Sequence, residues 1–237
     1  MTYKIHLAGS FGPEDVRADW APSTFGLPAE VAGEIESAWA AAVGQRGTML
    51  FDGPMCRVEG WRREGKRLRL SLSRTSYKWF WGTNLHRPQL GERYGAAALA
   101  NALGLSAMVE SADGYFLLGR RSGAVAYHPH RVHPFAGSAT GLDVFAEMRR
   151  ELAEELALAE SDIAEMTCIG MAEDRAIRQP ELVFRVLCTH DCAEIERALD
   201  LAEHTQLVAI RPDDQPSDDW TPIAVAALAL RRQMHQK

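Results

Sequence analysis

The chain has 237 residues, enough for one large domain or two small ones. Its formal net charge of −6, with no concentrated basic patch, argues against a nucleic-acid-binding surface. No signal peptide is visible, and no apolar run approaches the about 18 residues of a membrane span. The four cysteines lack the spacing of a disulfide framework. We therefore expect a soluble, cytoplasmic protein with reduced thiols and no membrane partner, and the sequence makes no prediction of oligomeric state.

The first 95 residues alternate between expected strands and one helix. A strand is expected over 3–8, and a helix over 28–43, with Pro28 at its start and Gly44 just after its end. Apolar residues recur every four positions in this helix: Val31, Ile35, Trp39 and Val43. Further strands are expected at 49–51, 56–61 and 67–72, followed by a compact aromatic segment at 76–81. We predict that residues 1–95 form a small N-terminal α/β region.

The second region is expected to begin with a short helix or turn at 96–103 and a hairpin. Strands at 105–109 and 115–118 flank the turn residues Ser111–Gly114. A loop over 122–141, rich in Pro, His and Gly, precedes a carboxylate-rich helix. The remaining predicted elements are strands at 166–171, 181–188 and 206–210 and helices at 193–201 and about 221–234. This order predicts an α+β domain over 96–237, with a mixed sheet sandwiched by helices.

The carboxylate-rich helix has two chemically different faces. Four carboxylates spaced three and four apart share one face: Glu147, Glu151, Glu154 and Glu155. An apolar stripe occupies the other: Phe145, Met148, Leu152 and Leu156. Like charges at these spacings cost an isolated helix roughly 0.2–0.5 kcal/mol each, and a bound hard cation such as Mg²⁺ would offset that cost. The alternative is a solvated acidic face paired with Arg149 and Arg150.

The run R-E-L-x-E-E at 150–155, followed by Leu158, resembles the second half of the Nudix box, G-x5-E-x7-R-E-U-x-E-E-x-G-U, where U is aliphatic. Pro134 and Gly141 also match the usual lead-in P-G-G-x-x-E-x-G-E. Three positions depart from the pattern. Ala136, Leu142 and Ala157 stand where the box has its first glycine, first glutamate and last glycine, with Gly137 and Asp143 adjacent to the first two.

Segments outside the box resemble one eukaryotic branch of the Nudix superfamily, represented by an animal UDP-glucose diphosphatase and related plant proteins. The segment 72–84, L-S-R-T-S-Y-K-W-F-W-G-T-N, resembles the branch element "grTsYrdflGTN", and 51–53 stands where the branch has F-N-G. Further similarity lies at 116–122, 169–173 and 180–184. The resemblance covers roughly residues 51–188.

The resemblance implies a Nudix-type α/β/α sandwich that uses Mg²⁺, with Mn²⁺ as an alternative, to cleave a nucleoside diphosphate derivative. The implied metal ligands are Glu151, Glu154 and Glu155. The implied catalytic residues are Glu151, Glu154, Arg150 and Glu181, with Glu181 as a base or extra ligand and Glu173 and Asp174 behind it. Arg150 is expected to orient a glutamate, because a guanidinium pairs with a carboxylate in a bidentate manner. A plain strand-end residue is the alternative for Glu181.

Candidate substrate-binding residues are Tyr77, Thr83, Asn84, Arg120 and Arg121. An aromatic ring suits stacking on a nucleobase and an amide suits reading its edge, although Tyr77 and its aromatic neighbours would equally pack the junction between the two regions. Of the two arginines, only one is expected to face inward, because successive strand residues point to opposite faces. Three histidines at 128, 130 and 133 lack the regular spacing of a zinc site and favour a substrate-facing loop.

The favoured substrate is a nucleoside diphosphate sugar, UDP-glucose or UDP-galactose, cleaved to a nucleoside monophosphate and a sugar 1-phosphate. One alternative is hydrolysis of another nucleoside diphosphate derivative, such as ADP-ribose or an oxidised nucleotide. The other is a non-catalytic Nudix-fold protein that binds nucleotides, an alternative motivated by the three departures from the box.

Overall fold

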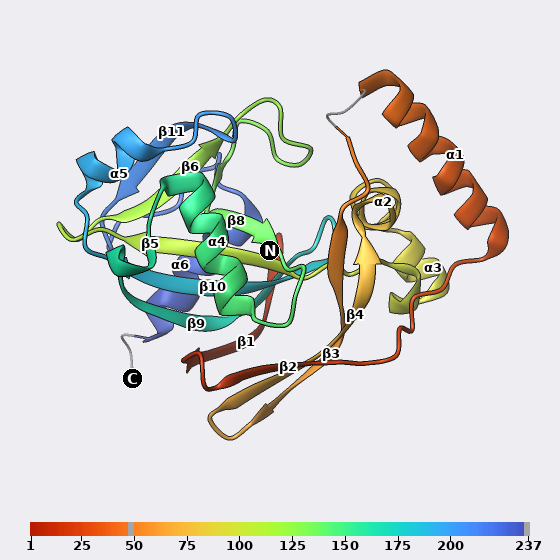
Figure 1. Ribbon diagram of the computed structural model, residues 1–237, viewed down its shortest axis with the longest axis horizontal. Coiled ribbons are helices and arrows are strands. Elements are labelled where there is room, and N and C mark those ends of the chain that lie inside the picture. The colour runs from red at the N-terminus through yellow and green to blue at the C-terminus, as the bar shows by residue number, and fades with distance from the viewer. Residues whose placement is uncertain (47–49, 235–237) are drawn as a thin grey trace.

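The computed structural model describes residues 1–46 and 50–234, and within them eight strands form one mixed sheet (Figure 1). Its strands are β1 (Tyr3–Phe11), β5 (Gly104–Glu110), β6 (Phe116–Arg121), β7 (Val132–His133), β8 (Phe135–Ser138), β9 (Ile163–Asp174), β10 (Gln179–Cys188) and β11 (His204–Ile210). The order is β1-β9-β10-β5-β6-β11, with β7 beside β6 and β8 beside β5. β10 and β5 run parallel, whereas β5 and β6 form the antiparallel hairpin that the sequence predicts.

Helices cover both faces of this sheet. α4 (Val144–Leu156) lies on one face and α6 (Pro222–Met234) on the other, while α5 (Cys192–Ala198) lies near β11 (Figure 1). The apolar stripe of α4 enters one core, where the Phe145 ring meets Phe184 of β10 edge-on at 5.2 Å. A second core lies under α6 and includes Ile223 and Leu230. The expected α+β class, with a mixed sheet between helices, is confirmed.

Both ends of α4 have identifiable caps. The Asp143 carboxylate accepts hydrogen bonds from the backbone N–H groups of Phe145 and Ala146, at 3.2 and 3.0 Å, and so begins the helix. Ala157 ends it in the left-handed conformation, with φ of 53°. That conformation favours glycine, which is the residue that the Nudix pattern has at this position.

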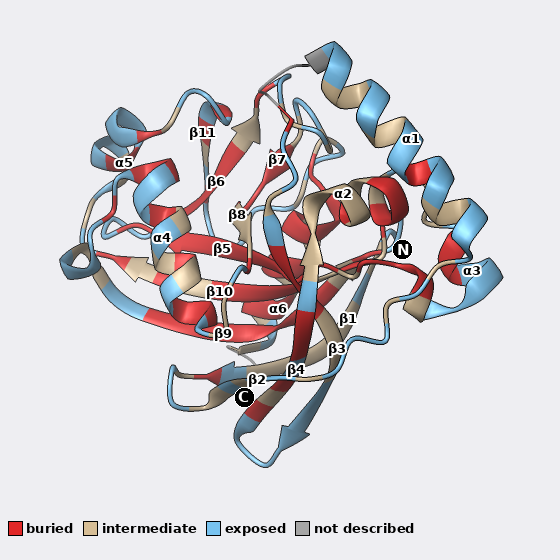
Figure 2. Cartoon of the chain, turned by 45° about the vertical axis from the view of Figure 1, so that its right-hand side comes forward, coloured by how far each residue is buried: buried red, intermediate tan, exposed pale blue. Residues whose placement is uncertain are grey.

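A second, smaller sheet is formed by strands that lie between β1 and β5 in the sequence. It contains β2 (Val16–Trp20), β4 (Arg67–Ser76) and β3 (Pro54–Glu64), in that order. The helical elements beside it are α1 (Ala29–Arg46), α2 (Tyr77–Phe80), the π-helical turn η2 (Trp81–Leu85), α3 (Leu90–Tyr94) and η3 (Ala96–Ala98). α1 is mostly exposed (Figure 2). Its buried Ile35 packs on Gly82 so closely that an added Cβ at Gly82 would lie 2.2 Å from the Ile35 side chain. Gly82 is therefore needed for this helix to approach η2.

The predicted division at residue 95 is wrong for the start of the chain. β1 pairs with β9 along the edge of the large sheet, so residues 3–11 belong to that sheet and not to the smaller one. The two sheets also join directly, since Cys56 donates its backbone N–H to Ala139 and accepts from Leu103. Strand pairing between distant segments decides this boundary, and composition does not reveal it.

Several local predictions need correction. Residues 122–141 are not all loop, because β7 and β8 lie within them. α1 runs past Gly44 to residue 46, and β2 falls where no strand was expected. Of the strand expected at 49–51, Met49 lies outside the described residues, and residues 50–51 are not in a strand.

Over residues 1–46 and 50–234, no helix combines the length and apolar character needed to cross a bilayer. All four cysteines are free thiols: Cys56, Cys168 and Cys188 are buried and Cys192 is half-buried. Burial raises the pKa of the Cys168 thiol to about 12.

Candidate active site

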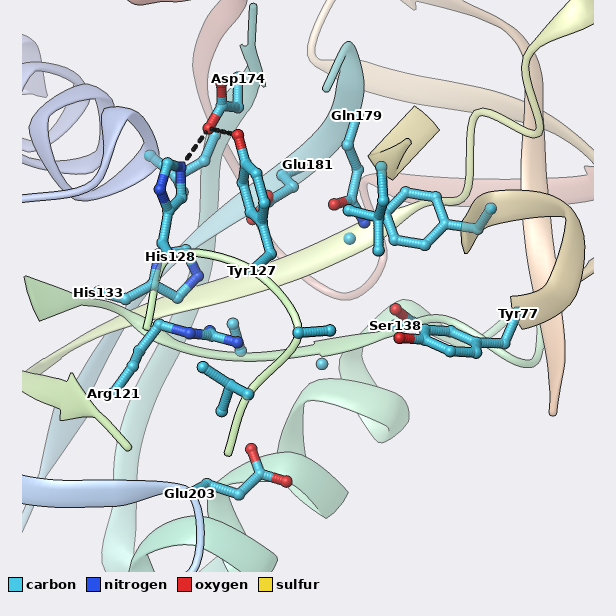
Figure 3. A pocket seen from close by; sticks show the side chains of 18 of the residues that line it. Tyr77, Arg121, Tyr127, His128, His133, Ser138, Asp174, Gln179, Glu181 and Glu203 are labelled. Carbon is cyan, nitrogen blue, oxygen red and sulfur yellow. Dashed lines mark hydrogen bonds and ion pairs between the residues drawn. The ribbon is translucent and has the colours of Figure 1, made fainter. Parts of the chain in front are cut away.

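A cavity of about 480 Å³ lies where the two sheets meet. Its walls come from α2, the loop at 124–128, residues 136–138 of β8, and the adjoining ends of β9 and β10 (Figure 3). The wall combines aromatic rings, as at Tyr77 and Phe80, with charged groups, as at Arg121 and Glu181. The volume and the mixed lining are typical of a small-molecule site.

Arg121 is the cationic group of this cavity. Its guanidinium forms no hydrogen bond or ion pair with any described residue, and its Nε is buried without a partner. Burial lowers the pKa of Arg121, while the nearby carboxylates of Glu203, Glu155 and Glu181 oppose that effect. Because arginine stays charged in proteins, an unpaired guanidinium in a cavity wall is suited to binding an anion.

Glu151 turns from α4 toward β8, whose backbone borders the cavity. An added Cβ at Gly137 would lie 2.0 Å from the Glu151 carboxyl carbon, so only glycine leaves room for this side chain. Burial, with the neighbouring charges of Glu155 and Glu154, raises the pKa of Glu151 to about 7 against the opposing effect of Arg150. Gly137, one position after the place of the first box glycine, is the residue that makes room for Glu151.

Glu155 also turns inward, to a different partner. Its Oε1 accepts a hydrogen bond from the Ala136 backbone N–H at 3.3 Å, and its Oε2 lies 3.0 Å from His204 Nε2. Burial raises the pKa of Glu155, although the contact with His204 acts against this. An added Cβ at Gly119 would lie 2.2 Å from His204 Nδ1, so Gly119 makes room for this imidazole.

Arg150 joins three carboxylates on the outer side of α4. Its Nη2 lies 2.6 Å from Glu151 and 3.2 Å from Glu147, and its Nη1 lies 2.9 Å from Glu154. The Glu154 side chain is 59% exposed, compared with 12% for Glu151. The structure therefore brings Arg150 to Glu151, as the sequence predicts, but it leaves Glu154 in solvent and away from the cavity.

Two of the three carboxylates expected to bind a divalent cation are placed where they could do so. Within the described ranges, no group of three or more His, Cys, Asp and Glu side chains is close enough to hold a metal ion, so the expected trio Glu151, Glu154 and Glu155 is not assembled. Glu151 and Glu155 remain as two hard oxygen donors that pack against the cavity-wall residues Gly137 and Ala136, and burial raises the pKa of both because it disfavours their charge. Two protein carboxylates completed by phosphate and water are a common Mg²⁺ environment.

Glu181 lies in the cavity wall at the start of β10, and its residue is 6% exposed. The Ser106 hydroxyl on the parallel strand β5 donates a hydrogen bond to it. Burial, together with the charge of Asp174, raises the pKa of Glu181 to about 7, against the opposing effects of Ser106 and Arg121. A carboxyl with such a pKa can exchange a proton near neutral pH.

The loop ahead of α4 closes one end of the cavity. Tyr127 donates its hydroxyl to Asp174 at 3.0 Å, and His128 Nε2 lies 2.9 Å from the same Asp174 oxygen (Figure 3). His133 is buried and lies 2.7 Å from the Thr221 hydroxyl, so the three histidines of this loop do not converge. His128 and His133 line the cavity, as a substrate-facing loop requires.

Three predicted substrate residues lie outside the cavity lining. Thr83 and Asn84 are fully buried and bind backbone groups: the Ala100 N–H donates to Thr83 Oγ1 at 3.0 Å, and Asn84 Nδ2 donates to the Ile177 carbonyl at 2.9 Å. These side chains hold η2 against two other chain segments. Arg120 faces away from the cavity and pairs with Asp219 at 2.8 Å. Tyr77 and Arg121 do line the cavity, and alternation along β6 explains why only one of the two arginines does so.

Four further residues at or beside this site give no signal in the sequence. His204, Glu203, Ser138 and Gln179 were not singled out, and all but His204 line the cavity. Gln179, Glu203 and His204 come from segments far from the Nudix-like box, Ser138 lies at one of its variable positions, and none of the four belongs to a local motif. Each of two of them packs near a glycine on a neighbouring strand, His204 on Gly119 and Gln179 on Gly104, and only the folded sheet reveals this relation.

Comparison with known proteins gives structural similarity only. No family model matches the chain, and no curated protein matches it by sequence. It is similar to the NUDIX domain of Shewanella oneidensis NrtR complexed with ADP ribose, with 13% identity, 62% of this chain and 97% of that chain covered, and a TM-score of 0.46. It is also similar to a mutT/nudix family protein from Listeria innocua, with 14% identity, 57% and 94% covered, and a TM-score of 0.45. A third similar structure is a C. elegans Ap4A hydrolase binary complex, with 16% identity, 56% and 96% covered, and a TM-score of 0.39.

Proposed function

We propose that the protein is a divalent-metal-dependent hydrolase of the Nudix type that cleaves the diphosphate of a nucleoside diphosphate derivative. The observation that carries this proposal is the unpaired guanidinium of Arg121 in a cavity whose wall residues Gly137 and Ala136 contact Glu151 and Glu155. The Arg121 guanidinium would bind a phosphate, and the carboxylates of Glu151 and Glu155 would bind Mg²⁺ or Mn²⁺. The favoured substrate is UDP-glucose or UDP-galactose, from the resemblance of the segment at 72–84.

Three side chains have proposed roles in this reaction: Arg121, Arg150 and Glu181. Arg121 binds a phosphate oxygen and orients the diphosphate, while Arg150 keeps Glu151 turned toward β8. Bound Mg²⁺ would neutralise phosphate charge and lower the pKa of the attacking water. Glu181 is the proposed base that accepts a proton from this water, since its pKa of about 7 lets it do so at neutral pH. Water adds to one phosphorus, and the bridging oxygen leaves with the other, giving a nucleoside monophosphate and a sugar 1-phosphate.

The direct test is incubation of the protein with UDP-glucose and Mg²⁺, with UMP and glucose 1-phosphate measured as products. Glu155→Gln serves as the inactive control, and ADP-ribose, an oxidised nucleotide and a dinucleotide polyphosphate complete the substrate panel. Release of UMP supports the sugar-nucleotide assignment, and a higher kcat/KM for another diphosphate reassigns the substrate. Tight nucleotide binding without turnover at any Mg²⁺ or Mn²⁺ concentration would instead identify a non-catalytic binding protein.

A further inference from the structure

Gln179 presents an unpaired amide to the cavity. Its residue is 9% exposed, and its side chain forms no hydrogen bond with any described residue. A side-chain amide in a largely buried residue normally has hydrogen-bond partners for its donors and its acceptor. In Figure 3 the amide end of Gln179 lies between the Tyr127 ring and the segment that carries Tyr77. This group is polar, buried and available to a ligand.

The neighbouring strand makes room for this amide. Gly104 of β5 lies so close that an added Cβ would be 3.1 Å from Gln179 Nε2 and 2.4 Å from Glu181 Cγ. Any larger residue at 104 would displace the Glu181 side chain and crowd the Gln179 amide. Gly104 therefore leaves the space in which the Gln179 and Glu181 side chains lie next to each other in the cavity wall.

Besides Glu181, the cavity that Gln179 faces has an aromatic and apolar wall. Tyr77, Phe80, Tyr127 and Leu85 line the same cavity and belong to one apolar cluster. A planar heterocycle buries its faces well against such rings, and its edge then needs a hydrogen-bonding partner. The part of the cavity beside Gln179 is less suited to a phosphate. Among the described lining residues, Arg121 is the only lysine or arginine, and the phosphate is expected to bind there.

We propose that Gln179 reads the edge of a nucleobase, and so determines base specificity, in the cavity whose Arg121 binds the phosphate. The amide offers one acceptor and two donors, which match a base edge that carries an N–H beside a carbonyl, as in uracil. This inference rests on the proposed function for the presence of a nucleotide. It assigns to Gln179 the part that the sequence analysis gave to Asn84, whose amide is occupied by backbone groups.

The test measures binding without turnover. Calorimetry with UMP, CMP, AMP, GMP and ribose 5-phosphate is performed on the whole chain and on Gln179→Leu, Gln179→Asn and Gln179→Glu. Gln206→Leu is the matched control, because the Gln206 amide bonds to Arg120 outside the cavity. Circular dichroism confirms that each variant is folded.

We expect Gln179→Leu to weaken binding of the preferred nucleoside monophosphate about 10- to 100-fold and to leave ribose 5-phosphate unchanged. Gln179→Glu should shift preference toward GMP, because a carboxylate only accepts and guanine offers two adjacent donors. Gln206→Leu should match the wild type. Equal loss for ribose 5-phosphate and the nucleotide, an unchanged affinity in Gln179→Leu, or no nucleotide binding by the wild type would each overturn the inference.

These outcomes separate the inference from the proposed function. If nucleotide binding depends on Gln179 but no diphosphate is hydrolysed, the hydrolase assignment fails and the base-reading role stands. If UDP-glucose is hydrolysed by the wild type and by Gln179→Leu with the same kcat/KM, the base-reading role fails and the hydrolase assignment stands.

Discussion

Arg120 and Arg121 are consecutive residues of β6 whose guanidinium groups lie on opposite sides of the sheet. Arg120 pairs with Asp219 and donates to the His130 carbonyl, whereas Arg121 faces the cavity without a described partner. Two residues of the same type therefore have different tasks, because strand geometry alternates their direction.

This contrast predicts different effects of the two alanine substitutions. Arg121→Ala should weaken UDP binding about 10- to 100-fold, because a hydrogen bond to a charged group contributes about 1.5–3 kcal/mol. Arg120→Ala should leave that affinity within a factor of two or so and only lower thermal stability slightly. Calorimetric titration of UDP into both variants checks this. Equal affinities for the two variants would remove Arg121 from the phosphate site.

Replacement of Glu181 should change how stability depends on pH. Its pKa is raised to about 7 in the folded protein from an ordinary 4.5, so the folded state binds more protons between these two values. Stability contributed by this group is present below about pH 4.5 and is lost as the pH rises through about 7. At about 1.4 kcal/mol per pKa unit, the loss is on the order of 3 kcal/mol.

Glu181→Gln should therefore unfold at a higher urea concentration than the wild type at pH 8, with the difference vanishing near pH 4.5. It should also abolish the rise in kcat/KM that a base with a pKa of about 7 produces between pH 6 and 8. Urea unfolding and pH–rate profiles of both proteins measure these effects. A wild-type advantage in stability at pH 8 would contradict the raised pKa.

Asn84 is predicted to act on stability and not on substrate binding. Asn84→Ala leaves the Ile177 carbonyl and the Asn101 N–H without their buried partner, which should cost about 2–4 kcal/mol of unfolding free energy. Urea unfolding measures the loss, and KM for the substrate should stay unchanged in the folded fraction. Thr189→Ala, on the exposed surface, is the control for the substitution itself. A selective rise in KM without loss of stability would restore Asn84 as a substrate residue.

The left-handed conformation of Ala157 predicts a stabilising substitution. Ala157→Gly should raise the free energy of unfolding by about 1 kcal/mol, because glycine adopts positive φ at no steric cost. Ala146→Gly, inside the same helix and exposed, should lower it by about the same amount. Thermal unfolding of the two variants checks the opposite signs. A lower Tm for Ala157→Gly would argue against the αL end of this helix.

Gly137 is predicted to be essential for the position of Glu151. Gly137→Ala places a Cβ 2.0 Å from the Glu151 carboxyl, which must move outward, and a displacement of this size can reduce activity about 100-fold. The Mg²⁺ concentration for half-maximal activity and direct Mn²⁺ binding by paramagnetic resonance should both worsen. Gly33→Ala, whose Cβ would meet nothing within 4 Å, is the control. Unchanged Mn²⁺ affinity in Gly137→Ala would show that Glu151 does not bind the ion.

Periodicity in the sequence was sufficient to predict α4, its buried stripe and most strands. Helical spacing alone places Phe145, Met148, Leu152 and Leu156 on one side, and the structure buries all four. Asp191 caps α5 by accepting a hydrogen bond from the Glu194 backbone N–H, which is a purely local contact. The sequence also placed Glu181 at the start of a strand, but its inward position depends on the pairing of β10 with β5.

Contacts between distant segments decided the rest. The same helical spacing puts four glutamates on one face of α4, yet Glu154 remains in solvent while Glu155 meets His204, which is 49 residues away. Likewise, the amide of Asn84 binds the chain 93 residues further on, and the cavity presents Gln179 instead. Local spacing determines which way a side chain leaves its helix or strand. Only the packing of β6, β8, β10 and β11 against one another determines what that side chain meets, because strand register brings together residues that no short pattern relates.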